Sequence, residues 1–182
     1  MKTSRPTALI IIAFCAVIPD LLVKLLAVLH RSYVLPYYCR EYLELLNLVP
    51  WQGMVFGIVF SVGVSIALGP NLRIGANEIF AMFLLCPLVQ FFVPLLAGSA
   101  GRLLSAMSIP LFIPVHFLQA ALIAALTGGV LRAEIGLLGA LCTGAVAACA
   151  SSLSLIQGLP VYPIEFWHLV VGLTIGLFII RD

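Results

Sequence analysis

Long stretches without a charged side chain constrain this protein more than any other feature of its sequence. Residues 45–68 and 103–131 contain no Asp, Glu, Lys or Arg. The whole chain is 63% hydrophobic and only 9% charged, whereas a soluble domain carries about 25% charged residues. A chain with so few polar side chains cannot cover a globule with a polar surface, so we expect the lipid bilayer to be its solvent.

Six segments are long and apolar enough to cross a bilayer, which takes about 20 mostly apolar residues in a helix. They cover residues 7–29, 45–68, 79–97, 104–131, 135–157 and 161–180. The connections between them are short, and the longest runs from His30 to Glu44. The sequence therefore predicts an all-α fold in which residues 1–182 form one transmembrane domain, a polytopic membrane helix bundle of six helices.

The basic residues outside these segments favour one orientation. With six spans, both termini lie on the same side of the membrane. Five basic residues fall on that side and three on the other: Lys2, Arg5, Arg73, Arg132 and Arg181 against Arg31, Arg40 and Arg102. Because cytoplasmic loops are enriched in Lys and Arg, we expect both termini in the cytoplasm and the chain in a bacterial inner membrane. Trp51 and Trp167 are interpreted as anchors at the membrane interface.

Small residues recur at four-residue spacing in four segments. The positions are Gly53 and Gly57; Ala120, Ala124 and Gly128; Gly136, Ala140, Gly144 and Ala148; and Gly172 and Gly176. Such stripes let helix backbones approach one another closely within a membrane. We interpret them as helix packing in a compact bundle.

Asp20 and Lys24 are charged residues within the first apolar segment. Charged groups inside a bilayer are costly and are usually functional. Their spacing of four residues allows them to pair on one face of a helix. One interpretation is an ion or proton site, or a docking pair for a partner helix. The other is that Lys24 extends to the interface while Asp20 caps a helix or pairs with it.

His116 lies just after Pro110 and Pro114. Each proline removes a backbone donor and interrupts a helix. A broken helix with a titratable imidazole at the break is typical of a permeation or binding element. The alternative is a kinked span whose histidine forms a hydrogen bond to a neighbouring helix.

Three further polar residues are candidates for an ion or partner pathway. Gln90 lies between Pro87 and Pro94, so its segment is expected to be kinked, and its amide forms either an interhelical hydrogen bond or a ligand contact. Glu165 and His168 are three residues apart and can face each other at a helix start. Glu165 could also simply cap that helix, because its dipole favours a carboxylate there.

Several classes of protein are excluded by what the sequence lacks. Asp20 and Asp182 are its only aspartates, which rules out an intramembrane aspartyl dyad. It has no H-E-x-x-H, no glycine-rich phosphate loop and no C-x-x-C among its five cysteines. The scattered basic residues make no nucleic-acid-binding patch. We therefore expect no catalytic residues, no metal site and no cofactor held by this chain alone.

Three sequence blocks carry a resemblance to a known family. PDLLVKLLAVLH includes Lys24, GPNLRIGANEIFAMFLLCPLVQFF includes Gln90, and SIPLFIPVHFLQ includes His116. With the six-segment layout, they resemble the six-span subunits of the Rnf and Nqr redox-driven ion pumps (RnfA/RnfE and NqrD/NqrE type). The family's cluster-holding cysteines would fall near Leu29 and Phe117. The resemblance thus implies a diverged subunit of an ion-translocating complex without the iron–sulfur cluster, associated with other membrane subunits.

A second resemblance is to lipoprotein signal peptidases. It rests on Asp20 and Lys24, on WQGMVF from Trp51 to Phe56, and on GSAGRLL and LPVYPIEF, which end at residues 104 and 166. The catalytic aspartates of that family would fall on Ser105 and Phe166. This likeness implies a protein that binds lipoproteins without cleaving them.

These observations leave three functions open. The first is a subunit of a complex that couples redox chemistry to ion translocation. The second is a small-solute transporter or a substrate-binding membrane component, since six short-looped spans with polar groups between them suit either. The third is the inactive peptidase-like protein.

Overall fold

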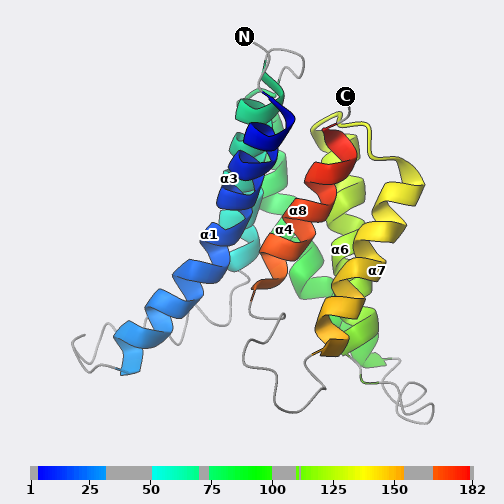
Figure 1. Ribbon diagram of the computed structural model, residues 1–182. Helices are drawn as coiled ribbons and strands as arrows, with labels where there is room; N and C mark the ends of the chain where they lie inside the picture. The colour runs from blue at the N-terminus through cyan, green and yellow to red at the C-terminus, as the bar shows by residue number, and fades with distance from the viewer. Residues whose placement is uncertain are drawn as a thin grey trace.

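The computed structural model describes residues 4–31, 51–69, 74–99, 110, 112–153 and 166–180. This part of the chain contains α-helices and no strand, as Figure 1 shows, so the all-α prediction is confirmed there. The helices are α1 (Arg5–Arg31), α3 (Trp51–Leu68), α4 (Ala76–Ser99), α6 (Phe112–Val130), α7 (Gly136–Leu153) and α8 (Trp167–Ile179). All except α8 are long and apolar enough to cross a membrane, which makes the chain a multi-pass integral membrane protein.

Two helices contain prolines in their interior. α1 runs continuously through Pro19, Asp20 and Lys24, and α4 encloses both Pro87 and Pro94. An interior proline costs a helix one backbone hydrogen bond. A helix in a packed bundle can bear this loss when another group satisfies the carbonyl that the proline leaves unpaired.

α6 begins later than the predicted segment 104–131. It starts at Phe112, so Pro114 stands in its first turn. A proline is tolerated there because the first N–H groups of a helix have no intrahelical partner. His116 therefore lies near the beginning of α6. Residues 104–109, where the expected break would begin, are outside the described part of the chain.

α8 is shorter than the predicted sixth span, 161–180. Its 13 residues measure about 20 Å at 1.5 Å per residue, less than the hydrocarbon core of about 30 Å. Residues 161–165 are outside the described residues, so the described part of the sixth segment is a short helix. Its first turn lies among the other helices, level with their middle portions in Figure 1.

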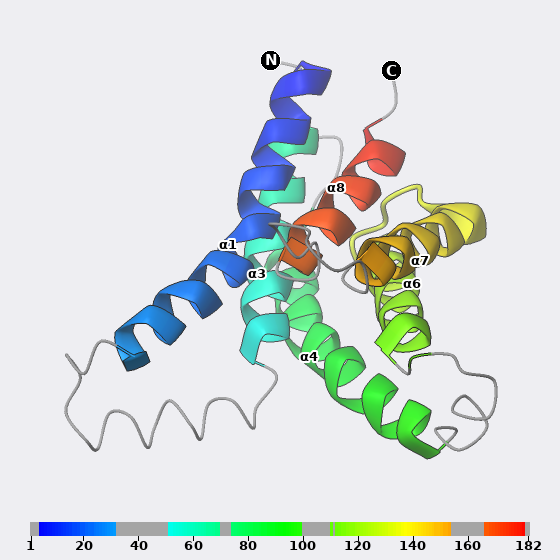
Figure 2. The same cartoon turned by 60° about the horizontal axis from the view of Figure 1, so that its bottom comes forward.

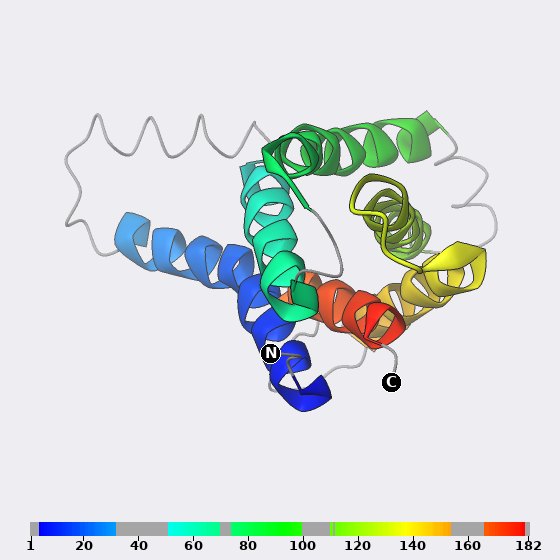
Figure 3. The same cartoon turned by 90° about the horizontal axis from the view of Figure 1, so that it is seen from above.

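The six helices form a closed ring. Each packs most extensively on two neighbours, in the order α1, α3, α4, α6, α7, α8 and back to α1. Figure 3 shows this arrangement along the bundle, and α8 also contacts α3 and α6 across it. α1 begins and α8 ends at the same end of the bundle (Figure 1), while the last turns of α1 diverge from the other helices (Figure 2).

The bundle exposes large apolar side chains and buries a mixture of apolar and polar ones. Phe14, Phe80, Leu96 and Leu137 are among the exposed residues. On the surface of a membrane bundle, such side chains face lipid tails. The buried core includes Ile12, Phe56, Phe60, Met82, Ile123, Val171 and Ile175. Polar side chains of several helices meet beside this core.

Glycines allow the closest helix contacts. A Cβ on Gly57 would collide with the main chain of Met82, and one on Gly172 would collide with the side chain of Ala16. These positions fit the predicted packing stripes. Gly136 does not, because it is exposed, has a φ of 63° and would have nothing within 4 Å of a Cβ. It serves the turn before α7, where a positive φ favours glycine.

Candidate functional site

Asp20 of α1 is buried beside the first turn of α8. Its side chain is 6% exposed. The Oδ1 atom lies 2.7 Å from Nδ1 of His168, and Oδ2 accepts a hydrogen bond from the backbone N–H of Leu169 at 3.2 Å. Phe166, which precedes α8, provides no side-chain cap. Asp20 therefore caps α8 from a different helix, at the end where the helix dipole favours a negative charge.

His168 has hydrogen-bonding partners at both ring nitrogens. Its Nε2 lies 2.8 Å from the amide nitrogen Nε2 of Gln90. Because an amide NH₂ only donates, the imidazole nitrogen accepts, and Nδ1 carries the proton that is donated to Asp20. The ring is 3% exposed and is packed against the rings of Phe56 and Trp167, each with its centroid 5.1 Å away.

Gln90 is connected to α6 through its main chain. Pro94, four residues later, has no N–H to donate to the Gln90 carbonyl. The side chain of Gln119, which is 7% exposed, donates to that carbonyl at 3.1 Å. Gln119 was not among the candidates from the sequence. The need for it arises from Pro94 on another helix, which sequence spacing does not connect with α6.

His116 belongs to a second polar pair in the same region. Its Nδ1 lies 2.6 Å from Oγ of Ser151 in α7. That hydroxyl donates to the Ala147 carbonyl at 2.8 Å, so Nδ1 of His116 is the donor to Ser151. The His116 ring also lies 5.9 Å from the Trp167 ring, centroid to centroid. Trp167 thus contacts both imidazoles.

Lys24 approaches the same end of α8 as Asp20. Its Nζ lies 4.2 Å from the centroid of the Phe166 ring, a cation–π contact. Asp20 and Lys24 of α1 therefore both contact the beginning of α8, with Asp20 hydrogen-bonded to His168 and Lys24 over Phe166. Glu165, the expected partner of His168, is outside the described residues.

Trp167 lies in the bundle interior and not at the exposed interface position expected from the sequence. It is 7% exposed, and its indole Nε1 is a buried nitrogen without a hydrogen-bond partner among the described residues. Unpaired buried donors are rare in folded proteins. No sequence signal marks this one, since it depends on which helices surround α8.

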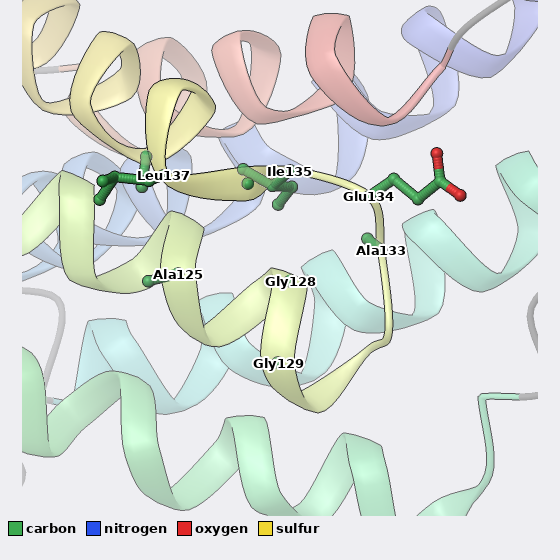
Figure 4. Close-up of a pocket in the computed structure, with 9 residues that line it drawn as sticks. Ala125, Gly128, Gly129, Ala133, Glu134, Ile135 and Leu137 are labelled. Carbon is green, nitrogen blue, oxygen red and sulfur yellow. The ribbon is translucent and has the colours of Figure 1, made fainter.

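A pocket of about 330 Å³ lies away from these polar groups. Figure 4 shows it between the last turns of α6 and the turn into α7. Ala125, Gly128, Gly129, Ala133, Glu134, Ile135, Gly136, Leu137 and Ala140 line it. None of these lining residues takes part in the hydrogen bonds described above.

These polar groups form two sets. Hydrogen bonds link Asp20, His168, Gln90 and Gln119 in one set, and His116 and Ser151 form the other. Together they come from five of the six helices. Proton exchange and hydrogen bonding to a solute are the chemistry that these groups can perform. Among the described residues, no three His, Cys, Asp or Glu side chains gather to hold a metal ion. Comparisons with protein families, curated proteins and solved structures find no match to this chain.

Proposed function

We propose that this chain is an ion-translocating component of a bacterial inner membrane, in which Asp20 and His168 take up and release a proton. The single observation that carries the proposal is their hydrogen bond of 2.7 Å inside a ring of apolar helices. A carboxylate and an imidazole at this depth are costly to bury. Linked acidic and histidine side chains are the usual groups of proton relays in membrane pumps and transporters.

The partners of His168 give the proton a defined place. In the neutral ring, Nδ1–H donates to Asp20 and Nε2 accepts from Gln90. A second proton on Nε2 would require Gln90 to present its amide oxygen instead. Rotation of that amide accommodates both protonation states without moving a helix. The pair can therefore exchange a proton while its surroundings stay packed.

We further propose that the chain works as a subunit of a larger membrane complex. The motive is the resemblance to Rnf and Nqr subunits, together with an outer surface of apolar side chains such as Phe80 and Leu96. That surface suits both lipid and neighbouring transmembrane helices. Isolation from the native membrane in mild detergent, followed by mass spectrometry, tests this part of the proposal. Absence of a stoichiometric partner would contradict it.

Proton flux tests the role of the pair. The protein, with any subunits that co-purify, is reconstituted into liposomes containing a pH-sensitive dye, and a membrane potential is imposed. We expect Asp20→Asn to abolish the flux, because the charge is lost while the shape is kept. The control is Glu134→Gln, an exposed carboxyl in the turn before α7. Wild-type flux in folded Asp20→Asn, or no Asp20-dependent flux in any preparation, would overturn the proposal.

A further inference from the structure

The indole N–H of Trp167 is a buried donor with no acceptor in the described part of the chain. Trp167 is the first residue of α8 and is 7% exposed. Its Nε1 is inaccessible to solvent, and none of the residues that the structure describes forms a hydrogen bond with it. Because this atom does not reach the outer surface, neither lipid headgroups nor bulk water can satisfy it. A donor in this position is suited to an acceptor that enters the bundle.

A second hydrogen-bonding group lies beside it. The rings of His116 and Trp167 are 5.9 Å apart and inclined at 44°. The Nδ1 of His116 is held by Ser151, so Nε2 is the ring atom left to contact a molecule bound next to Trp167. If this nitrogen is protonated, it donates, just as the indole does.

The end of α8 adds a third contribution. The first N–H groups of a helix have no intrahelical partner, and the helix dipole makes this end positive. Asp20 accepts the N–H of Leu169, the third residue of α8. Trp167, in the same turn, lies beside the His116 ring. The indole N–H, together with the Nε2–H that His116 gains when a proton is taken up with the ligand, favours an oxygen anion near a positive helix end over a cation or a neutral apolar molecule.

We propose that Trp167 and His116 form a binding site for a small monocarboxylate. One carboxylate can accept hydrogen bonds from the indole N–H and from protonated His116 at the same time. The ring of Phe112 lies 6.2 Å from that of His116, and Phe56 and Trp167 pack on His168. These aromatic rings supply an apolar wall that suits a short alkyl group.

The site adjoins the proton-exchanging pair, because Trp167 and His168 are consecutive residues. A carboxylate at Trp167 and a proton at His168 would both act on the first turn of α8. The inference names a substrate class for the proposed function and rests on that function only for the movement of the bound carboxylate. Binding itself depends on Trp167 and His116.

Acetate binding can be measured at Trp167 directly. The chain has two tryptophans, so Trp51→Phe leaves Trp167 as the sole indole. In this variant, labelled with ¹⁵N in the indole, sodium acetate is titrated while the N–H resonance is followed. We expect a saturable downfield shift of the proton. Sodium chloride at equal ionic strength and neutral acetamide serve as controls, and neither should reproduce the shift.

Two further variants identify the site. In the Trp51→Phe background, His116→Phe should weaken acetate binding by about tenfold or more, whereas Glu134→Gln, at an exposed carboxyl away from both histidines, should leave it unchanged. Ser151→Ala removes only the hydrogen-bond acceptor of His116 and should weaken acetate binding less than His116→Phe does. Because this change is small, it still tests the site if His116→Phe fails to fold. A shift that chloride reproduces, a shift that survives His116→Phe, or no saturable shift would overturn the inference. Asp20-dependent proton flux without acetate binding would support the proposed function and contradict the binding site. Acetate binding without such flux would support the binding site and contradict the proposed function.

Discussion

The side chain of Gln119 in α6 donates a hydrogen bond of 3.1 Å to the main-chain carbonyl of Gln90 in α4. This bond explains how a membrane-embedded helix accommodates a proline. Pro94 lies within α4 and cannot supply the N–H that would normally reach Gln90. An unpaired carbonyl in an apolar surrounding is costly. Gln119 therefore satisfies a group that Pro94 leaves without its helical partner.

This relationship predicts that the effect of Gln119→Leu depends on residue 94. With Pro94 present, the substitution should lower the free energy of unfolding by about 1–3 kcal/mol, because the Gln90 carbonyl loses its donor. In a Pro94→Ala background, the alanine N–H can donate to that carbonyl and the loss should be smaller. Pro94 is exposed, so its replacement leaves no cavity. Denaturant unfolding in detergent of the two single variants and the double variant measures the coupling. Equal losses in both backgrounds would show that Gln119 acts elsewhere.

Replacing Asp20 by an apolar residue should destabilise the protein more than replacing it by asparagine. Asp20→Leu removes the acceptor of both the His168 Nδ1–H and the Leu169 N–H, at about 1–3 kcal/mol for each unpaired donor. Asp20→Asn keeps an oxygen for one of them and should cost about half as much. Melting temperatures in the same detergent give the comparison.

The double variant Asp20→Leu/His168→Leu provides the control for this prediction. Removing the imidazole also removes one of the donors that Asp20→Leu leaves unpaired. We therefore expect the double variant to lose less stability than the sum of the two single variants. Strict additivity would mean that the two side chains do not interact.

Much of the helical framework follows from the sequence because a bilayer restricts the backbone so strongly. Apolar stretches bounded by charged residues predicted helices where the structure has α1, α3, α4 and α7, as far as those segments are described. The same constraint marked Asp20, Gln90, His116 and His168 as unusual, since polar groups at membrane depth need partners. The structure brings all four to the first turn of α8 or next to residues that contact it.

The pairings themselves could not be predicted. The spacing of residues along one helix suggested that Asp20 pairs with Lys24 and that Glu165 pairs with His168. The structure joins Asp20 to His168, across 148 positions of sequence, while Glu165 is outside the described residues. Hydrogen bonds between helices depend on the order of helices in the ring, which hydropathy does not contain. The interior position of Trp167 could not be predicted for the same reason, because it depends on which helices pack around α8.

Gly57 should tolerate no side chain. A Cβ there would overlap the carbonyl and carbon of Met82 in α4, and a main-chain obstacle cannot rotate away. We expect Gly57→Ala to destabilise the protein by about 1–3 kcal/mol, since overpacking displaces a helix. Gly129→Ala in α6 is the matched control, because nothing lies within 4 Å of its Cβ position. That substitution should be neutral or stabilising by up to about 1 kcal/mol. Similar melting temperatures for both variants would contradict the close contact of α3 and α4.

Closure of the ring can be tested by cross-linking α8 to α1. A Cβ at Gly176 would lie 3.2 Å from Cγ2 of Ile12, so the two positions contact each other between α8 and α1, and a disulfide between cysteines placed there would report this contact. In a background where the five native cysteines are replaced by Ala or Ser, Ile12→Cys with Gly176→Cys should form a disulfide on mild oxidation in the membrane. Cleavage of the chain between α1 and α8 at an inserted protease site would then leave the two fragments joined on a non-reducing gel. Ile12→Cys with Gly129→Cys, which pairs α1 with α6, is the control and should separate. Fragments that separate in the first pair would place α8 outside the ring, and the hydrogen bond between Asp20 and His168 would lose its structural basis.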